Sequence, residues 1–323
     1  MLIKNFIGQT DTIEDIEIQL LGHNKRKEFP STIIGLKGQR GMGKTHLGKV
    51  ISNAIKKLYP ERDISYIEKI GNDFNGNKDL LNALVSGLDD KVIFIDEVQE
   101  MKAKPEQEHL RWHIERNDPY GRKHGDILWI FATTDFADLI SPLRNRINHM
   151  YDYKPYEPEE MIKIVKLMSN SDQRLGYEID TASAKLIAEN SRFTPRTARN
   201  FLLKLKNEMS AINDQQIELV KRIFRRSGIY PKGLTQKEID ILRLLFETTG
   251  LKHESHDVRA GLSKSQVLSK LGLNKKEYED IFEPYLLRLG LVETNSSGRR
   301  ISLDGENYYT RILRLQEKGN IYE

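Results

Sequence analysis

Residues 38 to 45 combine three glycines with a lysine and a threonine, shortly after the apolar pair Ile33-Ile34. The stretch Gly38-Gln39-Arg40-Gly41-Met42-Gly43-Lys44-Thr45 fits the pattern G-x-x-x-x-G-K-[ST]. Glycines let the backbone wrap closely around a polyphosphate, and the helix expected next adds the positive end of its dipole. We expect Lys44 to reach the β and γ phosphates and the Thr45 hydroxyl to hold Mg²⁺. The alternative is a glycine-rich strand-to-helix turn that carries a lysine and binds nothing.

A second group of candidate residues ends the apolar run VIFIDE, residues 92–97. Ligands of open α/β sheets bind beyond the carboxyl ends of the strands, which is where this run places two carboxylates. Asp96 suits the coordination shell of magnesium, and Glu97 suits polarising a water for attack on the γ-phosphate. Alone, the pair could equally be a solvated strand end. Together with the glycine-rich loop, it predicts a nucleoside triphosphate site.

Three further side chains are candidates for the same chemistry. The run ILWIFATTD (127–135) ends in hydroxyls, so Thr134, or Thr133 next to it, could touch the γ-phosphate or the attacking water. Arg146 in SPLRNRI could reach the γ-phosphate of a neighbouring subunit, and a solvated surface arginine is the alternative. Arg196 in TPRTARNFL could close on the nucleotide from a lid, or could be an ordinary residue of a helix start.

The elements that must position these residues alternate along the first 150 residues. Short β-branched runs (STIIGL, DISYIEK, KVIFIDE and DILWIFATT) are separated by helical stretches. Runs that are apolar almost throughout are typical of a parallel sheet covered on both faces. We therefore predict an α/β fold with a nucleotide-binding domain over residues 1–150.

Helical periodicity takes over after residue 150, from YKPYEPEEMIKIV to IELVKRIFRRSG. We predict a helical lid domain over 151–228, followed by GIYPKG (228–233) as a linker. Three helical patterns and the polar turn TNSSGRR then follow, which is the order of elements in a winged helix. We assign the winged helix to residues 229–323.

Composition limits the classes of protein to which the chain can belong. Its 323 residues predict two or three domains, and its net charge of +4 is compatible with nucleic acid. The absence of cysteine excludes disulfides, thiolate metal sites and a cysteine nucleophile. No apolar run is long enough to span a membrane and no signal-peptide pattern opens the chain, so we expect a cytoplasmic protein.

The motifs in this order resemble the AAA+ ATPases, and among them the RuvB branch-migration motors. The segments that carry the resemblance cover nearly the whole chain: FIGQ (6–9), GMGKT, FIDE, ATT, SPLRNR, TPR and FEPYLLRLGLVET with GRR. The resemblance implies a homo-oligomeric ring, expected to be a hexamer, that couples ATP hydrolysis to movement on double-stranded or branched DNA in recombination or repair.

The resemblance also implies a role for each matching residue. It makes Asp96 a magnesium residue with Thr45, Glu97 the water residue, Thr134 sensor 1 and Arg196 sensor 2. It makes Arg146 the finger that acts on a neighbouring subunit, with Arg144 as the other candidate. The residues implied to bind the nucleotide are Ile7 and Gly8 at the adenine end, and Gly38, Gly41, Gly43, Lys44, Thr45 and His46.

The chain departs from the RuvB pattern at three places. Gln39-Arg40 replaces the usual Pro-Pro, with side chains expected to point away from phosphate, and Asp135 replaces an arginine. The stretch from Val98 to Asp126 is shorter, and the missing part corresponds to the β-hairpin that docks RuvA in that family. The resemblance therefore implies DNA translocation without implying RuvA docking, and a plasmid- or phage-type relative with its own partner stays open.

The turn SSGRR offers Arg299 and Arg300 for DNA binding. We expect these side chains to contact phosphates without reading sequence, supported by the nearby Lys264, Lys270, Lys275 and Lys276. A solvated turn or a protein-docking module are the alternatives. His253 and His256 lack converging ligands for a metal. Trp112 and Trp129 lie in apolar patterns and are predicted to be core residues.

Three functions remain open at this level. The first is an ATP-driven motor on double-stranded DNA. The second is an ATP-switched assembly factor, such as a helicase loader or a regulator of replication or transposition. The third is a transcription regulator, for which KKEYEDIFEPYLLRLG lacks a set of base-reading side chains.

Overall fold

The computed structural model describes residues 2–4, 6–101, 105–115, 125–249, 261–319 and 321–322. The chain divides into two compact units, and each is described by itself. The first contains residues 1–160 and 194–196, and the second contains 161–193 and 197–323. The segment 194–196 thus belongs to the first unit, although its neighbours on both sides belong to the second. No helix in the described ranges is long and apolar enough to cross a membrane.

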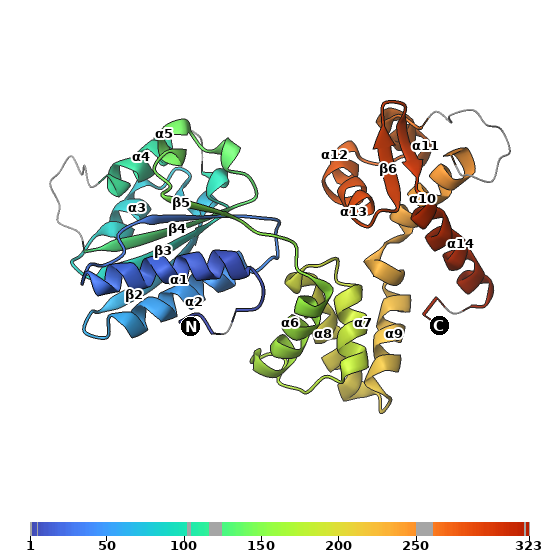
Figure 1. Ribbon diagram of the computed structural model, residues 1–323, viewed down its shortest axis with the longest axis horizontal. Coiled ribbons are helices and arrows are strands. Elements are labelled where there is room, and N and C mark those ends of the chain that lie inside the picture. Colours follow the sequence, from blue (N-terminus) through green and yellow to red (C-terminus); the bar gives the residue numbers. More distant parts are fainter. Residues whose placement is uncertain are drawn as a thin grey trace. The chain divides into compact units, whose positions relative to one another are not determined.

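A parallel sheet forms the middle of the first unit (Figure 1). Its strands within the described residues are β1 (Ile33–Lys37), β2 (Ile64–Ile70), β3 (Asp90–Asp96), β4 (Ile127–Thr133) and β5 (His149–Asp152). Their spatial order is β2-β3-β4-β1-β5, and every neighbouring pair is parallel. The first four confirm the strands predicted from the β-branched runs. The edge strand β5 was not predicted, because its four half-buried or exposed residues form no apolar run.

Helices cover both faces of the sheet, as the continuous apolar strands require. Helices α1 (Thr10–Lys25) and α2 (Lys44–Leu58) lie on one face (Figure 1). Helices α3 (Lys78–Val85), α4 (Pro105–Ile114) and α5 (Ser141–Arg144) lie on the other. The central strands β3 and β4 are consequently buried along nearly their whole length. Short 3₁₀ turns follow β2, β3 and β4: Gly71–Phe74, Val98–Glu100 and Phe136–Asp138.

The parallel arrangement brings the candidate residues to one edge of the sheet. Strand β1 leads into the glycine-rich loop, β3 ends at Asp96, and β4 ends at Thr133. In the register of the sheet, Lys37 of β1 lies beside Thr133 of β4, and Ile95 of β3 lies beside Phe131. Three stretches that are far apart in the sequence therefore meet at the carboxyl ends of neighbouring strands.

The second unit begins with a group of helices and ends with a winged helix, as the sequence predicted. The first group contains α6 (Pro158–Ser171), α7 (Thr181–Glu189), α8 (Pro195–Ala211) and α9 (Gln216–Arg226), of which α6 and α8 begin with residues of the first unit. The winged helix follows with α10 (Gln236–Thr249), α11 (Lys264–Leu271), α12 (Lys275–Glu277), a π turn (Tyr278–Phe282) and α13 (Glu283–Arg288). Its ribbon is β6 (Val292–Asn295) paired with β7 (Gly298–Ile301), and α14 (Leu303–Glu317) closes the chain.

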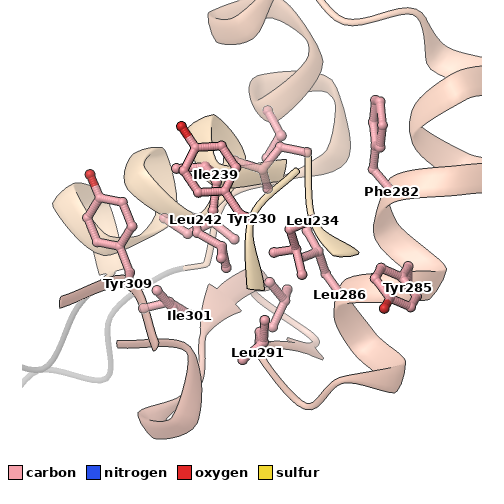
Figure 2. Close-up of a cluster of buried hydrophobic side chains, with 14 of the residues drawn as sticks. Tyr230, Leu234, Ile239, Leu242, Phe282, Tyr285, Leu286, Leu291, Ile301 and Tyr309 are labelled. Atoms are coloured by element: carbon pink, nitrogen blue, oxygen red, sulfur yellow. The ribbon is translucent and has the colours of Figure 1, made fainter. Parts of the chain in front are cut away.

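The segment predicted as a linker, residues 228–233, is packed rather than free. Tyr230 is buried in the core of the winged helix, where Figure 2 shows it beside Ile239 and Leu242. The turn Pro231–Gly233 follows, and the Gly233 N–H donates to Asn190 Oδ1 over 3.0 Å. The predicted boundary at 228 and 229 therefore lies inside the second unit.

Two neighbouring residues, Arg192 and Phe193, fasten the helical group to the winged helix. Both have left-handed backbones, with φ of 53° and 56°, which few non-glycine residues adopt. The Arg192 guanidinium donates two hydrogen bonds to the fully buried Glu238 carboxylate and lies 4.0 Å from the centre of the Tyr285 ring. The Arg288 guanidinium lies 4.2 Å from the centre of the Phe193 ring. Paired charges and ring contacts thus hold a strained stretch in place.

Candidate active site

The glycine-rich loop joins β1 to α2 and depends on two glycines with left-handed backbones. Gly41 has φ +83° and Gly43 has φ +91°. A Cβ on Gly41 would come within 2.8 Å of the Arg196 Cβ, so the position has no room for a side chain. Gly43 precedes the first residue of α2, and no side chain of the described part of the chain caps this helix. The positive end of α2 is therefore available to a phosphate.

Lys44 is held inside the loop by main-chain oxygens. Its Nζ donates to the Gly38 carbonyl over 2.6 Å and to the Gln39 carbonyl over 3.1 Å, and the residue is only 5% exposed. Burial lowers the pKa of Lys44, while the negative charges of Asp96 and Glu97 act to raise it. The two hydrogen bonds thus direct the ammonium group into the loop.

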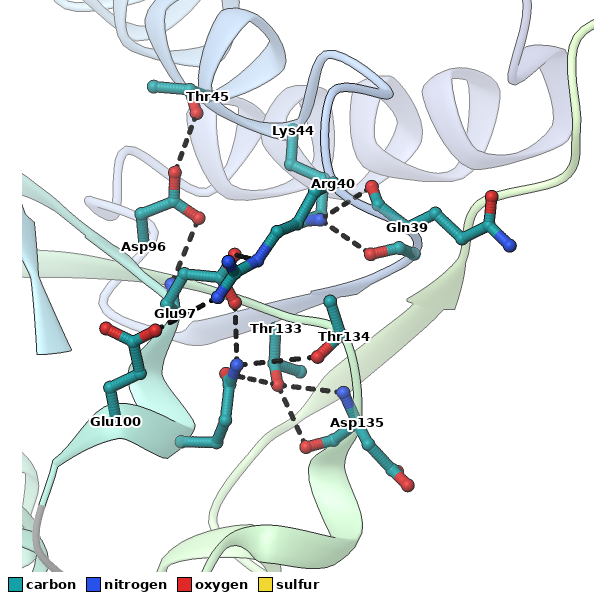
Figure 3. A network of polar contacts seen from close by, with 12 residues as sticks. Gln39, Arg40, Lys44, Thr45, Asp96, Glu97, Glu100, Thr133, Thr134 and Asp135 are labelled. Carbon is teal, nitrogen blue, oxygen red and sulfur yellow. Dashed lines mark hydrogen bonds and ion pairs between the residues drawn. The ribbon is translucent and has the colours of Figure 1, made fainter. Parts of the chain in front are cut away.

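Thr45 and Asp96 meet across the edge of the sheet. The Thr45 hydroxyl donates to Asp96 Oδ2 over 3.0 Å, and Asp96 Oδ1 accepts from the Glu97 N–H, also over 3.0 Å (Figure 3). A hydroxyl beside a carboxylate is the oxygen donor set that suits Mg²⁺, which usually takes its other ligands from substrate phosphates and water. The described residues contain no cluster of three or more His, Cys, Asp or Glu side chains suited to a metal.

Glu97 has a left-handed backbone and a carboxylate with both oxygens engaged. Its φ and ψ are 46° and 48°, an uncommon conformation that clusters at functional sites. Oε1 lies 2.8 Å from Arg40 Nε, and Oε2 accepts from Gln99 Nε2 over 2.6 Å. Glu97 was predicted from the sequence as a site residue, whereas its contacts with Arg40 and Gln99 were not predicted. The only available signal for Gln99 was its position two residues after Glu97.

The two threonines at the end of β4 differ in exposure. Thr133 is fully buried, and its hydroxyl oxygen lies 2.5 Å from Gln99 Oε1 and 2.8 Å from the Asp135 carbonyl oxygen, both of which can accept its hydrogen. Thr134 is exposed, and its hydroxyl accepts from Gln99 Nε2 over a long 3.4 Å. Of the pair, Thr134 is therefore the one that a ligand can reach, and Gln99 connects it to Glu97.

Arg196 lies against the loop through its backbone. Its N–H donates to the Gly41 carbonyl over 3.3 Å, and its positive charge is one of the influences that lower the pKa of Lys44, after burial. The Arg196 side chain itself is exposed. The structure thus places the Arg196 backbone beside the glycine-rich loop.

The N-terminal segment reaches the same loop from another side. Gly8 has φ +77°, and a Cβ there would come within 2.7 Å of the Tyr156 ring. The Tyr156 hydroxyl donates to the Met42 carbonyl over 2.8 Å, and the Phe6 ring stacks on His46 with 5.7 Å between centres. Ile7 and Gly8 therefore lie beside the loop, whereas Tyr156 was not foreseen because nothing in its local sequence marks it.

Arg146 lies on a turn after α5 and contacts its own chain. Its Nε and Nη2 each lie 2.7 Å from Glu115 Oε1. Arg144 ends α5, and its charge contributes to the lowered pKa of Asp135, after the hydrogen bond from the Ala137 N–H and the charge of Lys37. Within the described residues Arg146 is thus held by Glu115.

The two arginines of the wing have different surroundings. Arg299 Nε lies 2.5 Å from Glu283 Oε1, and the two side chains are 21% and 11% exposed. Arg300 Nη2 lies 2.8 Å from Glu293 Oε2, with side chains 45% and 50% exposed. Arg299 is consequently tied into the winged helix, and Arg300 faces the solvent. Of the neighbouring lysines, Lys264 pairs with Glu279 over 2.8 Å.

The remaining predictions have mixed outcomes. Trp129 is buried, but the prediction that Trp112 is a core residue is wrong, because its side chain on α4 is 45% exposed. His253 and His256 lie outside the described residues, as does most of the basic turn at 117–126.

Comparison with protein families yields two matches. Residues 34–154 match the family "ATPase family associated with various cellular activities (AAA)", and residues 231–310 match the "RuvB C-terminal winged helix domain". These ranges contain the nucleotide loop with the strand ends and the wing, respectively.

Comparison with individual proteins gives relatives along the whole chain. The Holliday junction branch migration complex subunit RuvB of Mesomycoplasma hyopneumoniae is 30% identical over 322 residues, which cover 96% of this chain and 95% of the relative. The corresponding subunit of Mycoplasmopsis pulmonis is 28% identical and covers 96% of each chain. A solved structure of a Thermotoga maritima RuvB mutant has a TM-score of 0.72 at 23% identity, over 95% of this chain and 97% of that one, and shows the shared fold.

Proposed function

Since this chain belongs to the RuvB family of AAA+ ATPases, we propose that it uses ATP hydrolysis to move along double-stranded DNA at branched junctions. The chain is an ATP hydrolase of the AAA+ type. The observation that carries the proposal is the meeting of Lys44, Asp96, Glu97 and Thr134 at one edge of the sheet. A loop for phosphates, an oxygen pair for a cation and a carboxylate for water are the parts that phosphoryl transfer to water needs.

At the nucleotide, we assign one role to each side chain. Lys44 binds the β and γ phosphates, and Thr45 with Asp96 would hold Mg²⁺, which neutralises phosphate charge when it is bound. Glu97 orients the attacking water. Thr134 acts as sensor 1 and Arg196 as sensor 2. These assignments rest on the fit between the donor types and the ligand, and on the motif match to the family.

We further propose that the chain forms a homo-oligomeric ring, a hexamer, in which Arg146 reaches the nucleotide of the neighbouring subunit. The exposed position of Arg146 supports this assignment, since its guanidinium is bound only at one side chain, Glu115, in the described residues. Arg144 is the alternative. An arginine supplied across a subunit boundary stabilises charge on the transferring phosphoryl group.

The proposed arrangement of the chain follows the predicted domains: a nucleotide domain over 1–150, a helical lid over 151–228 and a DNA-binding winged helix over 229–323. The wing contacts DNA phosphates, with Arg300 as the exposed contact. The shortened stretch from Val98 to Asp126 favours a partner other than RuvA. We place this activity in the cytoplasm.

The experiment that tests the function compares DNA substrates without a partner protein. ATPase rate and strand displacement are measured on linear, forked and four-way DNA, with Lys44→Ala as the inactive control. We expect ATP-dependent displacement that is strongest on four-way DNA. ATP hydrolysis without displacement on any of the three substrates would instead support an ATP-switched assembly factor, which family membership does not favour.

A further inference from the structure

The nucleotide loop carries a second cation, Arg40, at a position where the family usually has proline. Its guanidinium contacts two carboxylates: Nε lies 2.8 Å from Glu97 Oε1, and Nη2 lies 3.0 Å from Glu100 Oε1 (Figure 3). The Arg40 side chain is 60% exposed, whereas that of Glu97 is only 14% exposed. The sequence led us to expect a side chain that points away from phosphate. The structure adds an ion pair with Glu97, which proline could not form because its side chain carries no charge and no hydrogen-bond donor.

Glu97 is held from its other side by Gln99. Gln99 Nε2 donates to Glu97 Oε2 over 2.6 Å, and Gln99 Oε1 accepts from the buried Thr133 hydroxyl. Since Thr133 ends the central strand β4, Gln99 is anchored to the rigid sheet. Arg40, in contrast, belongs to the loop on which the phosphates bind. The Glu97 carboxylate is therefore bound on one side by Gln99, which is anchored to the sheet, and on the other by Arg40 of the phosphate-binding loop.

This arrangement fixes the rotamer of Glu97 and occupies one lone pair on each of its oxygens. A carboxylate that orients an attacking water must turn one oxygen toward that water. The hydrogen bond to Gln99 leaves the side chain some freedom to rotate, but a second bond on the opposite oxygen removes that freedom. Breaking the Arg40 contact is the less demanding change, because Arg40 is exposed and its charge can be satisfied by solvent or by Glu100.

We propose that Arg40 is a positioning residue that restrains Glu97 and keeps ATP turnover low until the ion pair opens. This inference rests on the proposed role of Glu97 as the water-orienting carboxylate. Since Arg40 is part of the phosphate-binding loop, its ion pair links the conformation of that loop directly to the carboxylate. The residue thus regulates the hydrolysis step without contacting the reacting atoms.

The test compares Arg40→Gln with the wild-type chain in steady-state ATPase assays without DNA. We expect kcat to rise about 2- to 5-fold, the rate change that corresponds to an exposed ion pair of about 0.4–1 kcal/mol. The KM for ATP should stay unchanged, because Arg40 is assigned no phosphate contact. Arg40→Lys, which keeps the charge, should remain near the wild-type rate. Arg26→Ala, which removes another exposed ion pair, to Glu28, is the matched control and should change neither constant.

The salt dependence of kcat distinguishes restraint by the ion pair from a purely structural role of Arg40, which would leave kcat insensitive to salt. Between about 50 and 500 mM salt, screening of the ion pair should raise the wild-type kcat toward that of Arg40→Gln, whose own rate should stay flat. A wild-type rate that does not rise with salt, or a kcat of Arg40→Gln at or below the wild-type value, would overturn the proposal. A tenfold rise in KM would also overturn it, by making Arg40 a phosphate ligand.

Glu97→Gln separates this inference from the proposed function. The double variant Arg40→Gln with Glu97→Gln should be as inactive as Glu97→Gln alone, because the gain is predicted to act through Glu97. A double variant that regains activity refutes the restraint. If Glu97→Gln alone hydrolyses ATP at the wild-type rate, the assignment of Glu97 itself fails.

Discussion

The two wing arginines should separate stability from DNA binding, although they are neighbours in the sequence. Arg299→Ala is expected to destabilise the second unit and leave the number of phosphate contacts unchanged. Arg300→Ala is expected to do the reverse. The reason lies in their partners: Arg299 pairs with the largely buried Glu283, whereas Arg300 pairs with the exposed Glu293.

The size of each effect follows from exposure. Removing one partner of a buried pair costs about 3–5 kcal/mol, and an exposed pair contributes about 0–1 kcal/mol. With side chains 21% and 11% exposed, the pair of Arg299 and Glu283 lies closer to the buried limit, so we expect a loss of about 2–3 kcal/mol. For Arg300, at 45% exposure, we expect less than about 0.5 kcal/mol.

Urea unfolding and salt-dependent DNA binding measure the two effects. Arg299→Ala should lower the urea midpoint at constant m-value, and the added change Glu283→Gln should recover part of the loss because it removes the unpaired charge. Arg300→Ala should lower the slope of log K against log salt by about 0.9 per lost phosphate contact per engaged subunit. If Arg299→Ala keeps full stability but lowers the salt slope, the assignment of roles from exposure is wrong.

The nucleotide site yields three more predictions. Lys44→Ala should weaken equilibrium ATP binding about 10- to 100-fold through loss of a charge-assisted contact, while Glu97→Gln should keep the affinity and stop turnover; equal loss of binding would contradict the two roles. Mixing Arg146→Ala with Glu97→Gln should restore partial ATPase activity, and no recovery in proven mixed assemblies would assign Arg146 to its own subunit. Gly41→Ala should weaken ATP binding at least tenfold, because the left-handed backbone costs a non-glycine residue about 1–2 kcal/mol and the added Cβ would also collide with Arg196. Gly76→Ala is the control: Gly76 has φ +74° with nothing within 4 Å, so this variant should bind ATP normally in the same titration.

Local patterns were sufficient to predict the central strands and the glycine-rich loop between β1 and α2. The glycines before Lys44 and the helix after it are neighbours in sequence, so the loop's chemistry is encoded within a few residues. The contact between Arg40 and Glu97 is different, because the two residues are far apart in the chain. Their meeting depends on the order of the strands in the sheet, which periodicity alone does not give.

For two side chains, Arg299 and Trp112, the sequence held a signal about exposure that the predictions did not use. Neighbouring residues of a strand point to opposite faces, so Arg299 and Arg300 could not both face DNA in an ideal ribbon. On helix α4, Leu110 is fully buried, and a residue two positions later points well away from it, which leaves Trp112 exposed. The edge strand β5 lacked such a signal, because it is stabilised by pairing with β1 and not by an apolar run.

The path of the chain through its two units limits how this protein can be taken apart or recombined. The polypeptide passes between the units after residues 160, 193 and 196. A fragment that ends at residue 160 would contain the complete phosphate loop but lose the Arg196 N–H that bonds the Gly41 carbonyl. In a chimaera of two relatives with a single junction at residue 160, the phosphate loop would likewise come from one relative and the residue at position 196 from the other. Functional chimaeras between relatives therefore require the loop and the segment 194–196 to be inherited together.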